Sequence, residues 1–165
     1  MSINLGGIIM ISYYHEDIFT ADETFICHQV NCKGVMGAGL AKQIADKYPL
    51  VKERYLEMCK NYKISGNRLL GEYQIVSIGH ERTGYEQFVV NIFGQEDYGR
   101  SNKVYTDYNA LRIALYKLFE MYPSFTYAFP YGMGCGLANG NWYEVEEIIR
   151  DISNRFNTSV TIYWR

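Results

Sequence analysis

The sequence lacks the features that mark a membrane, secreted or zinc-binding protein. No apolar run approaches the roughly 20 residues that a membrane-spanning helix needs. The apolar residues from Ile8 to Ile11 have neither a basic region before them nor a cleavage site after them, so they predict a first strand and not a signal peptide. The four cysteines show no Cys-x-x-Cys spacing, which predicts reduced thiols and neither a disulfide framework nor a zinc site. They are Cys27, Cys32, Cys59 and Cys135. These absences predict a cytoplasmic protein with no membrane partner.

The chain also lacks the basic surface that is expected of a protein that grips a nucleic-acid backbone. Its 16 lysines and arginines are balanced by 18 acidic residues, the net charge is −2, and no Lys/Arg cluster is longer than two. Proteins that bind the phosphodiester backbone usually carry a basic face. Nucleic acid is therefore not the expected partner. Stacking of single-stranded bases on the 16 tyrosines stays open as an alternative, although the basic groove that such binding needs is missing.

The length of 165 residues predicts one domain over residues 1–165. A chain of this size buries roughly 70% of its unfolded surface, so it needs no metal or disulfide to hold it together. The hydrophobic fraction of 48% and the charged fraction of 21% are ordinary for a globular protein. No internal repeat, low-complexity tract or long linker divides the chain.

Strand and helix patterns alternate along the chain. Runs rich in β-branched and aromatic residues predict strands at 8–14, 24–30, 73–78, 87–93, 125–129 and 160–164. Apolar residues at helical spacing predict helices that begin near Leu40, Pro49, Leu111 and Trp142. Residues 81–84 predict a hairpin turn, and residues 94–103 predict a loop. This alternation predicts an α/β fold with a largely parallel or mixed sheet.

Two glycine-rich segments each follow a predicted strand and lead into a predicted helix. The first is Asn31-Cys32-Lys33-Gly34-Val35-Met36-Gly37-Ala38-Gly39, and the second contains Gly132, Gly134, Gly136 and Gly140. In this arrangement backbone N–H groups and a helix N-terminus can face a phosphate. One such segment alone could be a mobile surface loop. Because both leave strands at the carboxyl end, where α/β folds bind ligands, they predict a ligand with two phosphates, or with a phosphate and a sugar.

Two common phosphate-binding motifs are absent. No Gly-x-x-x-x-Gly-Lys-[Ser/Thr] sequence occurs, which excludes a Walker loop. A dinucleotide fingerprint needs Gly-x-Gly-x-x-Gly after the first strand. The series Gly132-x-Gly134-x-Gly136 instead follows a late strand, with Leu137 where the third glycine belongs, and the first segment has its glycines in the wrong order. Kinase and dehydrogenase functions are therefore disfavoured.

Two motifs in order resemble the macrodomain family: His28-Gln29-Val30-Asn31-Cys32-Lys33-Gly34-Val35-Met36-Gly37-Ala38-Gly39-Leu40-Ala41, and then Gly134-Cys135-Gly136-Leu137. The branch it resembles contains small stand-alone bacterial and phage proteins related to ADP-ribose-1″-phosphate phosphatases and ADP-ribosyl-glutamate hydrolases. The resemblance extends from Glu16-Asp17-Ile18-Phe19 to the last strand. It implies a three-layer αβα sandwich with a mixed, largely parallel sheet. It also implies a cleft for ADP-ribose or a derivative at the carboxyl ends of the strands, ADP-ribosylated proteins as further partners, and no cofactor or metal.

The resemblance also implies ligand contacts at particular residues. Asp17 would accept the adenine amino group beside the Ile18 backbone, and Asn31 would bind the distal ribose. Tyr131 would pack against a ribose. The diphosphate would be wrapped from one side by Gly37, Ala38 and Gly39, and from the other by Gly132, Met133, Gly134, Cys135 and Gly136.

Several of these residues have simpler interpretations. Asp17 could be a turn carboxylate, and Asn31 could form an Asx turn. Lys33 could reach a phosphate, but a solvated lysine explains it as well. His28, inside an apolar strand, could be an interior histidine and not a general base.

The sequence departs from the residues that the glutamate-ester hydrolases of this family use. Where they have a lysine after the strand at 87–93, this chain has Gly94-Gln95-Glu96-Asp97, with no lysine before Lys103. Where they have an acid after Gly-Cys-Gly-Leu, it has Ala138. The nearest polar candidate is Asn141, which with Glu144 three residues on also fits a helix N-cap.

Hydrolysis remains open without those residues. A water held by Asn31 and the loop N–H groups could attack a bond at the distal ribose, with His28 or Asp97 assisting proton transfer. The candidate catalytic residues are therefore Asn31, His28 and Asn141. The sequence predicts an ADP-ribose-binding protein that hydrolyses ADP-ribose 1″-phosphate, an O-acyl-ADP-ribose or an ester-linked ADP-ribosyl protein. The alternative is a module that binds ADP-ribose without chemistry.

Overall fold

The structure, a computed structural model, describes residues 4–5, 8–9 and 11–165, with side chains from residue 11 onward. Its centre is a six-stranded sheet in the order β3-β8-β7-β4-β6-β5. Every neighbouring pair is parallel except β5 and β6, which are antiparallel. The predicted mixed, largely parallel sheet is therefore confirmed. The strands are β3 (Ser12–Tyr14), β4 (Phe25–Asn31), β5 (Tyr73–Gly79), β6 (Gln87–Gln95), β7 (Thr126–Pro130) and β8 (Ser159–Tyr163).

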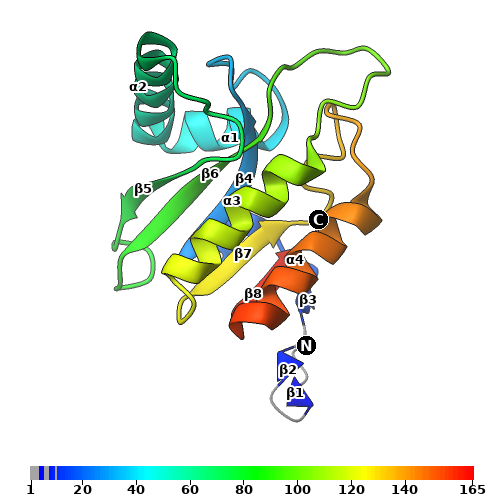
Figure 1. The fold of residues 1–165 in the computed structure, drawn as a ribbon. Coiled ribbons are helices and arrows are strands. Elements are labelled where there is room, and N and C mark those ends of the chain that lie inside the picture. Colours follow the sequence, from blue (N-terminus) through cyan, green and yellow to red (C-terminus); the bar gives the residue numbers. More distant parts are fainter. Residues whose placement is uncertain (1–3, 6–7, 10) are drawn as a thin grey trace.

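Helices cover both faces of the sheet (Figure 1). Helices α1 (Gly39–Lys47) and α2 (Pro49–Ser65) lie on one face, and α3 (Tyr108–Met121) and α4 (Trp142–Phe156) on the other. Two apolar clusters fill the spaces between the layers: Leu115 and Ile149 belong to the one under α3 and α4, and Ile44 and Val51 to the one under α1 and α2. This is the predicted three-layer αβα sandwich.

Strand β4 lies in the middle of the sheet because both of its faces are apolar. Phe25 and Cys27 pack into the cluster under α3 and α4, whereas Val30 packs with Ile44 on the opposite side. A strand that is buried on both faces has a mostly apolar sequence without strict alternation, and β4 fits this description. The first glycine-rich segment therefore starts from the interior of the fold.

One predicted strand, at 8–14, is wrong as a single element. Residues Ile8–Ile9 form β2, which pairs antiparallel with β1 (Asn4–Leu5) in a separate hairpin. Met10 lies outside the described residues. Only Ser12–Tyr14 joins the main sheet, where it pairs with β8 in the register Ser12↔Thr161. The sequence shows a continuous apolar run, but hydrophobicity does not encode a change of pairing partner along that run.

The other predicted strands are confirmed with ends that shift by one or two residues, and Pro49 starts α2 as predicted. A short 3₁₀ helix, η1 (Ile18–Thr20), follows β3. Between β6 and α3 the chain forms a loop, pinned near its two ends by a bridge between Gln95 and Thr106. Within the described residues, no helix combines the length and apolar character needed to cross a membrane.

Candidate functional site

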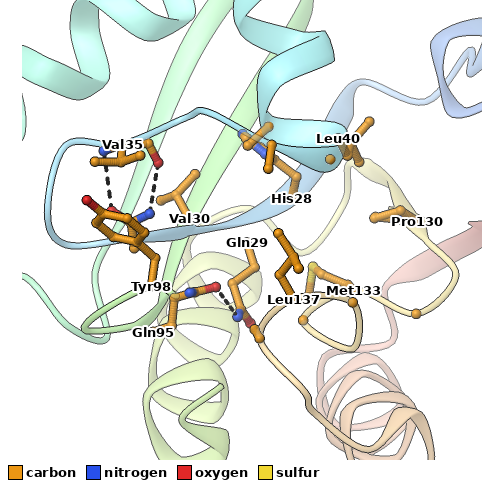
Figure 2. Close-up of a pocket in the computed structure, with 18 of the residues that line it drawn as sticks. His28, Gln29, Val30, Val35, Leu40, Gln95, Tyr98, Pro130, Met133 and Leu137 are labelled. Atoms are coloured by element: carbon orange, nitrogen blue, oxygen red, sulfur yellow. Dashed lines mark hydrogen bonds between the residues drawn. The ribbon is translucent and has the colours of Figure 1, made fainter. Parts of the chain in front are cut away.

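A cavity of about 620 Å³ lies at the carboxyl ends of β4, β6 and β7 (Figure 2). Four segments line it: the end of β4 with the loop after it, the first turn of α1, the loop after β6 and the loop after β7. In the view of Figure 2, Val35 and Leu40 lie along the upper side of the cavity, and Met133 and Leu137 along the lower side. The two glycine-rich segments therefore face one cavity from opposite sides.

Most of the ligand-binding residues predicted from the sequence lie in the lining. These are Asn31, Gly37, Ala38, Gly39, Tyr131, Gly132, Met133, Gly134 and Gly136, together with His28 from the predicted catalytic set. They come together because β4 and β7 are parallel neighbours, with Phe25 opposite Tyr127 and Ile26 opposite Ala128. Parallel neighbours end at the same edge of a sheet, so their following loops meet there.

The first glycine-rich loop is held by Asn31 and Tyr55. The Asn31 side chain accepts the Lys33 N–H through Oδ1 at 2.9 Å and donates to the Val35 carbonyl through Nδ2 at 2.8 Å. The Tyr55 hydroxyl donates to Asn31, 2.8 Å from both its carbonyl oxygen and its Oδ1. It also accepts the N–H groups of Gly34 and Val35 at 3.1 Å. Asn31 thus makes the Asx turn that was one of its two interpretations, while it also lines the cavity.

The N-terminus of α1 opens into the cavity without a side-chain cap. Its N-cap is Ala38, which makes no capping hydrogen bond, and the first helical residues Gly39, Leu40 and Ala41 line the cavity. By contrast, Asp107 and Asn141 cap α3 and α4 with their side chains. The free N–H groups at a helix N-terminus, together with the helix dipole, favour an anion.

The second glycine-rich loop has a backbone that a side chain would disturb. Gly134 has φ +74°, and a Cβ there would lie 2.7 Å from Gln29 Oε1 and 2.8 Å from Thr106 Oγ1. The N–H groups of Gly132, Gly134 and Gly136 have no hydrogen-bond acceptor among the described residues. The loop therefore offers bare backbone donors on the side opposite α1.

A third loop, which follows β6, completes the lining; the sequence pointed to Asp97 in this loop but did not predict the residues that line the cavity. Gln95, Tyr98, Gly99 and Arg100 all line the cavity. Gln29 joins this loop to β4, because its Nε2 donates to Gln95 Oε1 at 2.9 Å (Figure 2). The sequence signal here was position: Gln95 ends a strand next to β4, where the hydrolases that the sequence resembles have a lysine nearby. Polar loops carry no periodicity, so the sequence did not show which of its residues turn inward.

The same polar network reaches the second glycine-rich loop. Gln29 Nε2 also donates to Thr106 Oγ1 at 3.0 Å. Thr106 Oγ1 in turn donates to the Gly134 carbonyl at 2.6 Å. Strand β4, the end of β6 and the loop after β7 are therefore connected at the cavity through Gln29 and Thr106.

His28 lies on the cavity wall but behaves as an interior residue. Its Nε2 is 2.5 Å from Asn91 Oδ1, and Asn91 Nδ2 donates to Gln74 Oε1 at 3.0 Å. This arrangement assigns the proton to Nε2 and leaves Nδ1 with a free lone pair, which has no partner among the described residues. Burial lowers the pKa of His28 to about 4, although the Asn91 hydrogen bond opposes that shift. His28 is therefore neutral near pH 7 and can accept a hydrogen bond at Nδ1.

Three predicted site residues lie outside this cavity lining. The Asp17 carboxylate caps η1 by accepting the Phe19 N–H at 2.9 Å. Ile18 is buried against Ala21 in a small apolar cluster. Cys135 points away, with its thiol donating to the Met133 carbonyl, and burial raises its pKa to about 11. Cys135 is thus a thiol and not a nucleophilic thiolate at neutral pH.

Asn141, from the candidate catalytic set, and Asp97, a candidate for proton transfer, also lie outside the lining. Asn141 caps α4, where its Oδ1 accepts the Tyr143 N–H at 2.9 Å. Asp97 Oδ1 accepts the Tyr98 N–H at 2.8 Å. Both side chains therefore have local structural roles, and the N-cap interpretation of Asn141 describes the contact that it makes.

The described lining of the cavity contains many polar groups but little charge. Among the described residues that line it there is no aspartate, glutamate or lysine, and Arg100 is the one that carries a charge at neutral pH. The four cysteines are free thiols, and the described part of the chain brings together no group of three His, Cys, Asp or Glu side chains that could hold a metal ion. The site thus offers backbone N–H groups, amides and one guanidinium, a set of donors that suits an anion.

Curated proteins match part of this sequence. No family model matches the chain. Over 70 residues, 42% of this chain, it is 34% identical to a DNA ADP-ribosyl glycohydrolase from Mycobacterium tuberculosis, of which the match covers 19%. Over 85 residues, 50% of this chain, it is 31% identical to an ADP-ribose 1″-phosphate phosphatase from Candida glabrata, of which the match covers 46%. The chain therefore spans less than half the length of these curated relatives.

A solved structure covers much more of the chain. The macrodomain of Mycobacterium tuberculosis DarG superimposes with a TM-score of 0.75 at 25% identity, covering 93% of this chain and 97% of that one. This chain therefore has the macrodomain fold, and the resemblance that its two glycine-rich motifs predicted is confirmed.

The anchoring of the first loop gives a first prediction. Replacing Tyr55 with phenylalanine keeps the buried ring, which stacks on Phe93 at 5.8 Å, but removes the hydroxyl. We expect the free energy of unfolding to fall by about 1–3 kcal/mol, because the Gly34 N–H loses its acceptor and the Val35 N–H keeps only its longer contact with Asn31 Oδ1 at 3.4 Å. Urea unfolding measures this change. Tyr143→Phe is the control, since its side chain is 84% exposed. Equal losses in the two variants would contradict the anchoring role.

The burial of His28 gives a second prediction, on pH. Its folded pKa of about 4 lies below the ordinary histidine value of 6.5, so between these values the unfolded chain binds more protons than the folded one. Stability is therefore lost as pH falls from 6.5 to 4, by an amount on the order of 3 kcal/mol. We expect His28→Gln, which does not titrate, to flatten the pH dependence of the unfolding free energy in that window. Parallel pH profiles for the variant and the unmodified protein would contradict this.

Proposed function

We propose that this chain binds ADP-ribose in the cavity and hydrolyses a derivative of it at the distal ribose. The observation that carries the proposal is the pair of glycine-rich loops, which face one cavity from opposite sides beside the uncapped N-terminus of α1. A diphosphate between Gly37–Gly39 and Gly132–Gly136 would meet backbone donors on both sides. The cavity volume of about 620 Å³ is within the range of small-molecule sites.

The strand order suggests how the ligand lies. Asp17 and Ile18 follow β3 at one edge of the sheet, and the loop after β6 lies on the other side of β4. If adenine lies near Asp17, the diphosphate crosses the ends of β7 and β4, and the distal ribose lies near Asn31 and the loop after β6. Tyr131, which lines the cavity on the β7 side, would pack against a ribose between these ends.

The curated relatives support hydrolysis as the activity. One is named as a DNA ADP-ribosyl glycohydrolase and another as an ADP-ribose 1″-phosphate phosphatase, so both names describe hydrolytic reactions of ADP-ribosyl compounds. We extend to this chain the activity of a hydrolase that acts on an ADP-ribose derivative. Its substrate is part of the proposal, as are ADP-ribosylated proteins as partners.

The lining residues suggest which groups would act in hydrolysis. Asn31 uses one of its two Nδ2 hydrogens on Val35, so the other can be donated to a ligand or water in the cavity. His28 is neutral and lines the cavity, so it would place a polar ring without charge beside the distal ribose. Loop N–H groups would stabilise charge that develops in the transition state, where the loss of one donor typically costs ~10²–10³ in rate.

A binding module without chemistry is the second candidate, and one specific observation favours it. The described lining holds no carboxylate and no lysine that could serve as general base or nucleophile, and Asn141 is used as a helix cap. Such a site would hold ADP-ribose or an ADP-ribosyl group and release it unchanged.

A substrate panel separates the two candidates. The purified protein is incubated with ADP-ribose 1″-phosphate, O-acetyl-ADP-ribose, ester-linked ADP-ribosyl protein and ADP-ribosylated DNA, and the products are followed by chromatography. We expect release of the distal substituent from at least one of these, with ADP-ribose as the common product. Binding of ADP-ribose in calorimetry without release from any substrate would support the binding module and contradict hydrolysis.

Gly37 gives a matched test of the binding geometry. It is exposed, its φ is not positive, and a Cβ there would make only an ordinary contact of 3.6 Å with Val35. We expect Gly37→Glu, which puts bulk and negative charge beside the diphosphate, to abolish ADP-ribose binding in calorimetry without lowering thermal stability. Gly37→Ala is the control and should bind within a few-fold of the unmodified protein. Unchanged affinity in Gly37→Glu would mean that the ligand binds elsewhere.

A further inference from the structure

We infer that Arg100 recognises a phosphate group on the distal ribose and so selects ADP-ribose 1″-phosphate over derivatives with an uncharged substituent. The inference rests on the proposed function and concerns the same cavity. Among the described lining residues Arg100 carries the one charge, and no carboxylate there would neutralise it or repel a phosphate. A guanidinium forms two parallel hydrogen bonds to a phosphate, and these are stronger than bonds between neutral groups.

Arg100 has no ionic partner among the described residues, whereas two nearby lysines contact a carboxylate or an aromatic ring. Lys33 Nζ lies 3.4 Å from Glu96 Oε1, which joins the loop after β4 to the loop after β6. Lys103 Nζ lies 5.5 Å from the centre of the Tyr105 ring. No aspartate or glutamate oxygen of the described chain lies within 4.0 Å of the Arg100 guanidinium. Its hydrogen-bonding capacity is therefore left for a ligand.

The backbone around Arg100 is held in place on both sides. Gly99 packs against Tyr105 so closely that a Cβ would lie 2.2 Å from the Tyr105 hydroxyl oxygen. Asn139, which has the left-handed φ of +60°, donates from Nδ2 to the carbonyls of Ser101 at 2.9 Å and Lys103 at 2.7 Å. These contacts tie the loop after β6 to the second glycine-rich loop. Arg100 is thus presented from an anchored loop at the cavity wall.

The position of this loop points to the distal end of the ligand. β6 pairs with β4 on the side away from β7, whereas Asp17 follows β3 at the far edge of the sheet. With the diphosphate between the loops after β4 and β7, the start of the loop after β6 lies beyond it, on the side of the distal ribose, and the chain returns to the second glycine-rich loop at Ser101, after Arg100. A group attached to that ribose would be the part of the ligand that meets Arg100.

The size of the effect is limited by solvent. Arg100 is exposed, so its attraction for an anion is weakened by water and by salt. We therefore expect a preference of about 10- to 100-fold, in the range of a charge-assisted hydrogen-bonded contact. The same exposure predicts that the preference shrinks as ionic strength rises.

The test compares two ligands that are not consumed. One is ADP-ribose, and the other is its 1″-methylenephosphonate, in which a methylene replaces the bridging oxygen and prevents hydrolysis. We expect Arg100→Gln to weaken binding of the phosphonate by about 10- to 100-fold in calorimetry and binding of ADP-ribose by less than about 3-fold. Arg100→Lys should fall between, since it keeps the charge and loses the planar fork.

Lys103→Gln is the matched control, because it removes the same charge from the same loop at a residue that does not line the cavity. It should leave both affinities unchanged. If the unmodified protein binds ADP-ribose but Arg100→Gln weakens the two ligands equally, or neither, this inference is overturned while the proposed function stands. If the unmodified protein binds neither ligand, the proposed function itself fails. Equal losses in Lys103→Gln and Arg100→Gln would show general charge attraction and would also overturn the assignment.

Discussion

The parallel pairing of β4 with β7 is the constraint on which the rest of this molecule depends. It places the carboxyl ends of two interior strands side by side, so the glycine-rich segments that follow them must meet. Both strands are buried because helices cover both faces of the sheet. The apolar core thus determines where two loops with few side chains come together. The ligand site is a consequence of strand order as much as of loop sequence.

Glycine-rich loops can bind an anion well only if they are already held in position, and polar side chains do this here. Tyr55 and Asn31 hold the loop after β4, and Gln29 and Thr106 hold the loop after β7 from beneath. Asn139 fastens the loop after β6 to its neighbour. Preorganised donors lose little free energy to ordering when a ligand arrives.

The sequence predicted the layered fold because its apolar runs alternate cleanly between strand and helix patterns, and glycine spacing located two of the loops that line the cavity. It failed at residues 8–14, where one apolar run is divided between two sheets. It also missed Tyr98 and Arg100, because the inward direction of loop residues depends on contacts from distant positions such as Asn139 and Tyr105. Periodicity carries no such information. For Asn141 the helix-cap pattern was the informative signal, and it describes the contact that is made.

The most direct measurement of the central claim is a crystal structure of the protein with ADP-ribose. The account predicts the diphosphate between Gly37–Gly39 on one side and Gly132–Gly136 on the other, within hydrogen-bonding distance of backbone N–H groups from both loops. The distal ribose should lie toward Asn31 and the loop after β6. A ligand bound elsewhere, or a diphosphate that contacts only one of the two loops, would contradict the account.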